Sequence, residues 1–241
     1  MRALILSCST DLVGCGIQAG KRLFGEKAWE KRGNLILNGI DVAGFVYDAE
    51  KRAAIRAKLG LGDRFVLGHA GHLAEVKNQS FLLDLMPEVL KRRPDAMLLL
   101  LGEGGDRPML EQKIRDMALQ NHVIMTGNVT NVADYLSAMD VFVFPSIYEG
   151  VPVSMVEAQT AGLPCCISTN VPRETAITGL VEFISLEQNP EFWAERIRQR
   201  AEDPRRDMTR EIEQAGFDVS ATSKWLENFY RKVVAERGRA H

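Results

Sequence analysis

The sequence predicts a doubly wound parallel α/β sheet. Short apolar segments alternate with amphipathic stretches along most of the 241-residue chain, and strands that alternate with helices form a parallel sheet with helices on both faces. The apolar segments are β-branched or leucine-rich and lack a polar face, as is typical of strands buried on both sides. Apolar residues make up 46% and charged residues 26% of the chain, which excludes disordered, collagen-like and coiled-coil proteins.

The elements follow from this alternation in chain order. Helices are expected at about 13–24 and at Glu50–Leu59, Ser80–Arg92, Met109–Gln120, Val132–Met139 and Val153–Ala161. After Glu191 the chain is expected to be helical, and the last helix carries an apolar stripe that would pack on the core. That stripe consists of Trp225, Leu226, Phe229, Tyr230 and Val233. The expected strands are Ala3–Ser7, Leu35–Leu37, Phe65–Ala70, Met97–Leu101, Val123–Thr126, Val141–Phe144 and Pro164–Ser168.

The first 41 residues differ from the rest of the chain. They hold one expected helix between two expected strands, the second of which runs into Asn38-Gly39-Ile40-Asp41. So small a βαβ unit is a poor core, so we expect this region to pack on something larger. The sequence is therefore divided into residues 1–41 and 42–241.

Charge and cysteine spacing exclude several classes of function. Thirty basic against 32 acidic side chains give a net charge of −2, whereas nucleic-acid binding needs a basic excess. No apolar run is long enough to span a membrane, and the N-terminus turns polar at Ser7, too early for a signal peptide. The cysteines at 8, 15, 165 and 166 lack the C-x-x-C spacing of zinc sites. A cytoplasmic protein without a metal is expected.

A first candidate site follows the strand expected at Phe65–Ala70. The loop contains Gly71, where backbone can approach a ligand closely, and Lys77 just before a helix N-terminus, which attracts anions. Together they suit a phosphate. A solvated surface lysine is about twice as common, since most lysines are exposed. The glycine-rich turn Gly102-Glu103-Gly104-Gly105 lacks the full dinucleotide fingerprint and is interpreted as a sharp strand-to-helix connection.

A second candidate site follows the strand expected at Val141–Phe144. Glu149 and Glu157 flank a Gly-x-Pro turn, with Glu149 in the loop and Glu157 inside the following helix. A carboxylate offers two acceptor oxygens, which match the paired hydroxyls of a ribose or a hexose. The N–H groups between Gly150 and Val153 can meet a phosphate. Taken singly, Glu149 is interpreted as an exposed loop acid and Glu157 as an acid that stabilises the helix dipole. Taken together with Lys77, the two acids suit a nucleoside diphosphate sugar.

These residues resemble the retaining glycosyltransferases of family 4, which have the GT-B architecture. Glu149…Glu157 resembles the E-x7-E motif of that family, with Ala158-Gln159-Thr160-Ala161-Gly162-Leu163-Pro164 after it, and Gly71…Lys77-Asn78 resembles its phosphate loop. Asn38-Gly39-Ile40-Asp41 resembles the entry to its second domain. The resemblance implies a Rossmann-like C-terminal, donor-binding half at 42–241, a remnant of the acceptor domain at 1–41, and a role in making capsular or exopolysaccharides.

The resemblance also implies roles for individual residues. Lys77 and Glu149 would be catalytic, with Lys77 neutralising the diphosphate leaving group and Glu149 holding the transferred hexose. Glu157 would hold the ribose hydroxyls, and 127–132 would meet the base. No cofactor or metal is implied; the donor would be a nucleoside diphosphate sugar, with a UDP-sugar favoured. The implied substrate-binding residues are Gly71, His72, Asn78, Gly127, Asn131, Val132, Gly150, Val151 and Glu157.

Two departures from the family leave alternatives open. His72 stands where family members usually carry arginine, and histidine cannot fork onto a phosphate. Most of the acceptor-binding half is absent, so a missing N-terminal domain or self-association is expected to complete the protein. The implied partner is a glycan or lipid-linked acceptor, with the protein peripheral at the inner membrane face. A noncatalytic nucleotide-sugar-binding module, half of a split enzyme, and a nucleotide-sugar epimerase are the alternatives.

Overall fold

The computed structural model describes residues 2–238 and divides the chain into two compact units. One unit is Ala43–Glu211, and the other combines Met1–Val42 with Ile212–His241. Sequence reasoning places its division at the same point near residue 42, but it assigns the C-terminal helices to the sheet-containing part. The interpretation of 1–41 as a remnant of an acceptor domain stays a prediction.

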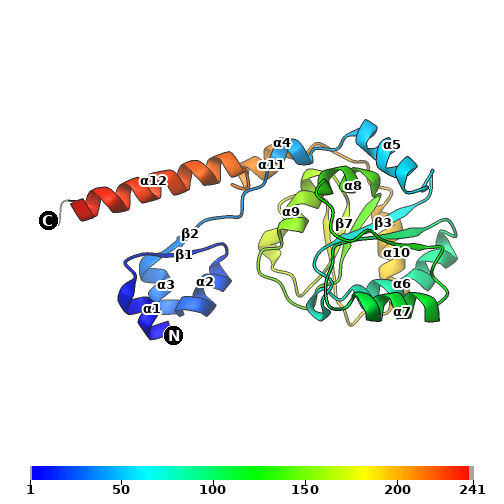
Figure 1. The fold of residues 1–241 in the computed structure, drawn as a ribbon, viewed down its shortest axis with the longest axis horizontal. Coiled ribbons are helices and arrows are strands. Elements are labelled where there is room, and N and C mark those ends of the chain that lie inside the picture. Colours follow the sequence, from blue (N-terminus) through cyan, green and yellow to red (C-terminus); the bar gives the residue numbers. More distant parts are fainter. Residues whose placement is uncertain (1, 239–241) are drawn as a thin grey trace. The chain divides into compact units, whose positions relative to one another are not determined.

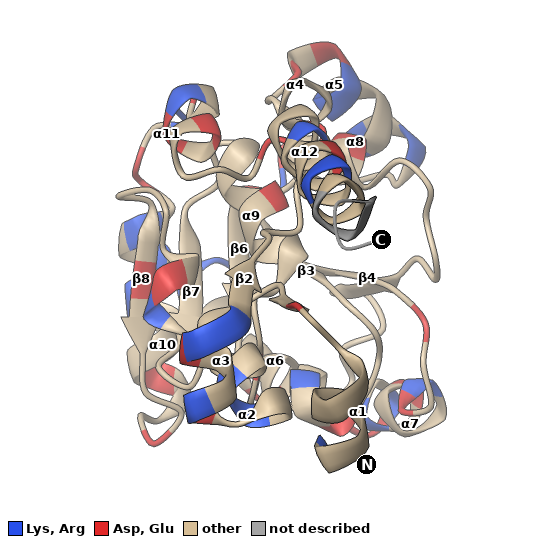
Figure 2. Ribbon diagram, turned by 90° about the vertical axis from the view of Figure 1, so that its left-hand side faces the viewer, with Lys and Arg blue, Asp and Glu red and all other residues tan. Residues whose placement is uncertain are grey.

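The larger unit is built on a six-stranded parallel sheet, as the sequence predicts (Figure 1). Its strand order is β5-β4-β3-β6-β7-β8. Strands β3, β4, β6 and β7 carry no charged residue and are tan in Figure 2, whereas charges gather on the helices. The strands are β3 (Val66–Ala70), β4 (Met97–Leu101), β5 (Val123–Met125), β6 (Val141–Phe144), β7 (Cys165–Ser168) and β8 (Val181–Ile184).

Successive residues of a strand point to opposite faces of the sheet. Both sets contain buried apolar residues here, so helices cover both faces. Leu67, Leu98 and Val143 share one core with α6, α7 and α10. Val66, Leu99 and Phe142 share the other core with α5, α8 and α9. Short connections complete the unit: α4 (Val42–Phe45), η1 (Glu75–Lys77), η2 (Arg173–Thr175) and the start of α11 (Thr209–Gln214). The covering helices are α5 (Ala49–Lys58), α6 (Gln79–Arg92), α7 (Arg107–Asp116), α8 (Val132–Ala138), α9 (Val153–Thr160) and α10 (Pro190–Arg200).

The smaller unit has a core of its own around Leu12, Phe24 and Trp29. A two-stranded parallel sheet pairs β1 with β2. Ile40 forms a bridge with Asp218, just before the last helix. The elements of this unit are α1 (Arg2–Cys8), β1 (Leu12–Gly14), α2 (Ile17–Phe24), α3 (Glu26–Arg32), β2 (Gly33–Leu35) and α12 (Val219–Gly238).

Several local expectations are wrong, mostly in the smaller unit. The segment Ala3–Ser7 is helical and lies within α1, because a short apolar run has no period that separates helix from strand. The strand expected at Leu35–Leu37 is β2 and ends at Leu35. Sequence reasoning missed β1, α3 and β8, and the chain after Glu191 is not all helix, since 201–208 is irregular.

The last helix does not bury the apolar stripe that sequence reasoning assigned to it. No residue of α12 between 219 and 235 is buried. Trp225 and Tyr230 keep 36% and 60% of their surface exposed. Trp225 and Phe229 instead stack on each other along the helix, with ring centroids 5.2 Å apart.

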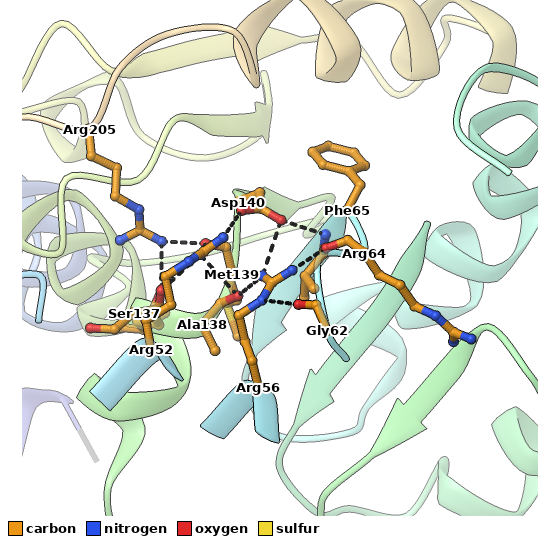
Figure 3. Close-up of polar contacts among 12 residues, drawn as sticks. Arg52, Arg56, Gly62, Arg64, Phe65, Ser137, Ala138, Met139, Asp140 and Arg205 are labelled. Carbon is orange, nitrogen blue, oxygen red and sulfur yellow. Dashed lines mark hydrogen bonds and ion pairs between the residues drawn. The ribbon is translucent and has the colours of Figure 1, made fainter. Parts of the chain in front are cut away.

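The strand order has a switch point between β3 and β6, where the chain turns from building one half of the sheet to the other. Asp140 joins the amino ends of these two strands (Figure 3). Its carboxylate accepts a hydrogen bond from the Val66 backbone N–H at 2.8 Å and pairs with Arg52 at 2.6 Å and Arg56 at 3.5 Å. The candidate motifs follow β3 and β6, and Asp140 therefore holds these two strands in register at their amino ends.

Arginines also bond the C-terminal carbonyls of α8 in Figure 3. Arg52 donates to the carbonyls of Ser137, Ala138 and Met139, and Arg56 donates to that of Ala138 at 2.7 Å. Arg205 donates to some of the same carbonyls. Cations at a helix C-terminus satisfy its unpaired carbonyls and oppose the negative end of the dipole.

We predict that Asp140→Ala destabilises the protein by about 3 kcal/mol, because it leaves Arg56 buried without its anion and the Val66 N–H without an acceptor. Asp140→Asn should cost less, since its amide oxygen can still accept from Val66. Urea unfolding followed by circular dichroism measures both. Equal stability of Asp140→Ala and the parent protein would show that the carboxylate does not hold these strands.

Candidate functional site

A cleft of about 310 Å³ opens at the carboxyl ends of β3 and β4, beside the start of α9. In open parallel sheets ligands bind at this end of the strands, near the switch point. The cleft brings together four of the predicted site residues, which are Gly71, His72, Val132 and Glu157. It lies wholly within the larger unit.

The loop after β3 is held by the turn after β4. Gly71 donates its N–H to the Leu101 carbonyl at 3.0 Å, and Leu73 donates to the Glu103 carbonyl at 2.9 Å. Gly102 has φ of +132°, and a Cβ there would lie 2.0 Å from the Gly71 carbonyl oxygen. Glycine is therefore required at 102 both for its backbone conformation and for the close approach of the two loops.

The same loop then delivers Lys77. Residues Glu75–Lys77 form the short helix η1, and Asn78 adopts the left-handed conformation with φ of 55° before α6 begins. The Asn78 side chain donates to the Pro145 carbonyl at 3.1 Å, and the Ile147 N–H donates to the Val76 carbonyl at 2.9 Å. These bonds join the loop after β3 to the loop after β6.

That junction places Lys77 against Glu149. The Lys77 ammonium lies 2.7 Å from the Glu149 carboxylate, with side chains only 20% and 10% exposed. The ammonium also sits 5.3 Å from the centroid of the Phe144 ring. The lysine stem runs beside Gly71, 3.8 Å from where a Cβ of that residue would be. Lys77 and Glu149, which the sequence predicts as site residues, thus form a shielded ion pair, and neither is among the residues that line the cleft.

Glu157 lies in the second turn of α9 and lines the cleft. Its carboxylate makes no ion pair or hydrogen bond with any other side chain in the described range 2–238. Burial raises the pKa of Glu157 to about 6, since no cation offsets the loss of water. A carboxylate that is desolvated and left without a partner costs stability, which points to a ligand that supplies hydrogen bonds.

The remaining predicted residues lie around these groups with differing roles. The Asn78 side chain bonds the Pro145 carbonyl, as described. Gly127 is buried, and its carbonyl accepts a hydrogen bond from the Gly102 N–H at 3.0 Å. Asn131 is exposed and its side chain is committed to Asp134 at 2.8 Å. Gly150 is exposed, and Val151 is partly buried. Neither Asn131 nor these last two residues line the cleft.

Sequence reasoning missed part of the cleft lining. Gly102, Glu103 and Ser154 line it without having been predicted, whereas Asn128 and Val129 line it within the segment 127–132 that is expected to meet the base. The glycine-rich turn at 102–105 was interpreted as a connection alone, yet it follows a strand adjacent to β3. Its position after a neighbouring strand was the signal that could have placed it at the site.

A larger cavity of about 740 Å³ lies at the opposite, amino end of the strands. Arg52 and Arg56 line it, but their guanidinium groups already bond Asp140 and backbone carbonyls. These guanidinium groups are therefore less available to a ligand than the unpartnered Glu157 carboxylate in the smaller cleft. No group of three or more metal-binding side chains was found among residues 2–238.

We predict that Glu157→Gln stabilises the protein above pH 6. In the unfolded chain the glutamate ionises near its ordinary pKa of 4.5, whereas in the folded protein its pKa is about 6. The stability of the parent protein should thus fall as pH rises through that window. At pH 8 the variant should be more stable by about 2 kcal/mol, at about 1.4 kcal/mol for each pKa unit. The gap should close near pH 4.5.

Urea unfolding at pH 8 and pH 4.5 tests this, with Glu174→Gln, at an exposed position, as the control variant. A stability gap of Glu157→Gln that does not depend on pH would contradict the burial of an unpaired carboxylate.

Comparisons with known proteins identify the family of the chain. The family model of glycosyl transferases group 1 matches residues 51–218. The chain is 37% identical over 235 residues to the putative glycosyltransferase EpsF of Bacillus subtilis, covering 95% of this chain and 61% of EpsF. It is 25% identical to the capsular polysaccharide biosynthesis glycosyltransferase CapH of Staphylococcus aureus, again over 95% of this chain and 62% of CapH.

Solved structures show the same fold. HepE of Anabaena, determined in complex with UDP-glucose, superposes with a TM-score of 0.78 at 20% sequence identity. The match covers 95% of this chain and 66% of HepE. The chain spans about three-fifths of the length of EpsF and CapH. The Rossmann-like sheet is that of GT-B glycosyltransferases, and the chain belongs to the family of glycosyl transferases group 1.

Proposed function

We propose that the cleft binds a nucleoside diphosphate sugar, with a UDP-sugar favoured. The observation that carries this proposal is the Glu157 carboxylate, which is desolvated, unpartnered and exposed to the same cleft as Gly71 and His72. Paired hydroxyls of a ribose donate two hydrogen bonds to such a carboxylate. HepE, which shares the fold, is described in complex with UDP-glucose.

The ion pair supplies the next part of the proposal. Lys77 would bind the diphosphate. The negative charge of the diphosphate would replace part of the attraction that Glu149 exerts on the Lys77 ammonium in the free protein. Glu149 would then accept hydrogen bonds from hydroxyls of the transferred hexose. The first N–H groups of α9 near Ser154, which have no partner within the helix, would add positive potential toward the phosphates.

The reaction that suits this arrangement is transfer of the hexose with retention of configuration. The bond from the anomeric carbon to the diphosphate oxygen breaks, and an acceptor hydroxyl attacks from the same face. Such a reaction depends on stabilising the negative charge that develops on the leaving group, which an ammonium at fixed distance can do. No metal is required for that step where Lys77 carries the charge.

The acceptor is proposed to be a glycan or lipid-linked saccharide in polysaccharide biosynthesis. CapH is named for capsular polysaccharide biosynthesis, and an Escherichia coli relative, 31% identical over 139 residues, transfers galactose from UDP-Gal to a diphosphoundecaprenol-linked sugar. An acceptor-binding domain, in the same protein or in a partner, would complete the site. A position at the inner membrane face stays a prediction; no helix within residues 2–238 is long and apolar enough to cross a bilayer.

We predict that Lys77→Met weakens UDP binding about 10- to 100-fold, because a hydrogen bond to a charged group contributes about 1.5–3 kcal/mol. Calorimetry with UDP measures the dissociation constant. Lys113→Met is the matched control, since Lys113 bonds Ser80 and Asp84 on the surface of α6 and not the cleft.

A double variant separates binding from stability. Lys77→Met leaves Glu149 shielded without its cation, and Glu149→Gln in the same chain removes that unpaired charge. The double variant should regain thermal stability while UDP affinity stays low. Unchanged UDP affinity in Lys77→Met would contradict the proposed role of the lysine.

We expect the chain to bind a UDP-hexose and any transferred hexose to keep the anomeric configuration of the donor. Incubation with UDP-hexoses and a lipid-linked acceptor, followed by mass spectrometry and NMR of the products, tests this. Binding without transfer would favour a noncatalytic module or half of a split enzyme, and a 2-epimerised UDP-sugar would favour an epimerase. An inverted product would contradict retention.

A further inference from the structure

A buried histidine that the proposed function does not use lies directly behind the cleft. His69 belongs to β3 and is fully buried. Its ring stacks on Phe144 and Phe142, with centroids 5.4 and 6.2 Å away. An imidazole contributes less to an apolar core than a phenyl ring, so its polar atoms require an explanation.

Those atoms form a chain of hydrogen bonds that ends at the cleft. His69 Nδ1 lies 3.0 Å from the Val143 carbonyl oxygen, and Nε2 lies 3.3 Å from Gln79 Nε2. The same Gln79 nitrogen donates to the His72 carbonyl at 2.9 Å. Gln79 is the first residue of α6 and is only 1% exposed.

The chemistry of these groups fixes every proton in the chain. The His72 carbonyl can only accept, so the Gln79 amide must present its NH₂ group there. The second hydrogen of that NH₂ requires an acceptor, which makes His69 Nε2 the unprotonated nitrogen. Nδ1 then carries the proton and donates to Val143. Burial, together with the nearby charge of Lys77, lowers the pKa of His69 to about 4, so this neutral form persists at neutral pH.

The chain of bonds holds one peptide group from two sides. The peptide between His72 and Leu73 has its carbonyl bound by Gln79 and its N–H bound by the Glu103 carbonyl at 2.9 Å. The preceding carbonyl, of Gly71, packs on the Cα of Gly102. Within the described part of the chain, the His72 N–H between them has no hydrogen-bond acceptor, and His72 lines the cleft.

We propose that His69 and Gln79 are positioning residues: by holding the peptide that follows His72, they fix the loop so that the free N–H of His72, which belongs to the preceding peptide, donates to the diphosphate of the donor. The identity of that ligand rests on the proposed function. The backbone donor differs from the His72 side chain, which cannot fork onto a phosphate as arginine does. The peptide that follows His72 is held on both sides, and the Gly71 carbonyl of the preceding peptide lies close to Gly102. The loop that carries the free N–H therefore does not have to reorganise when the phosphate arrives, which strengthens its contribution to binding.

The test uses the full chain with Gln79→Leu, which keeps the volume and removes both donated hydrogen bonds. We expect its dissociation constant for UDP to rise about tenfold, while binding of uridine, followed by NMR shifts, changes less than twofold. His69→Phe, which keeps the ring stack, should shift UDP affinity in the same direction. Ser137→Ala is the control, because it removes one buried hydrogen bond, to the Asp48 N–H at 3.3 Å, at the opposite end of the strands.

A second measurement does not depend on a ligand. The Leu73 amide should exchange with solvent at least tenfold faster in Gln79→Leu than in Ser137→Ala, and ¹⁵N NMR should show His69 protonated at Nδ1 alone. Equal loss of UDP and uridine binding, or unchanged Leu73 exchange, would overturn the positioning role. Failure of the parent protein to bind UDP would instead overturn the proposed function, and the exchange rates would still decide whether Gln79 holds the loop.

Discussion

The pairing of β3 with β6 is the constraint on which the site depends. These strands are far apart in the sequence and adjacent in the sheet, so their carboxyl-end loops meet at the switch point. Asp140 bonds the first residue of β3 at the amino end. At the other end, hydrogen bonds from Asn78 and Ile147 join the two loops. Without that register, Lys77 and Glu149 would not share one ion pair, and the loop of Gly71 would not face α9.

The two ends of the sheet differ in how completely their polar groups are satisfied. At the amino end, the guanidinium groups of Arg52 and Arg56, which line the cavity there, already bond carbonyls or Asp140. At the carboxyl end, Glu157 and the His72 N–H lack partners within residues 2–238. A desolvated carboxylate without a partner, such as that of Glu157, costs stability unless a ligand completes it. This asymmetry, more than the size of either cavity, makes the carboxyl end the candidate functional site.

The chain belongs to the glycosyl transferases group 1, and the ligand that we propose for the site is a sugar nucleotide. The geometry adds a division of labour. The charged side chain of Lys77 would bind the phosphate, and those of Glu149 and Glu157 would bind sugar hydroxyls. The backbone that Gln79 and the turn at Gly102 hold in place would donate a hydrogen bond to the phosphate. The chain spans 61% of the length of EpsF.

The sequence predicts the parallel sheet, most of its helices, and Gly71, Lys77, Glu149 and Glu157 as candidate site residues, because strand periodicity and motif spacing are local properties. It did not determine α1, where a short apolar run has no distinguishing period, or the exposure of Trp225, which depends on what lies beside a helix. The packing of strands and loops shows what no spacing predicts, namely that Glu103 lines the cleft and that Gln79 joins His69 to the His72 carbonyl. Such contacts join residues across neighbouring strands and loops, and no spacing along the chain encodes which buried polar groups will meet.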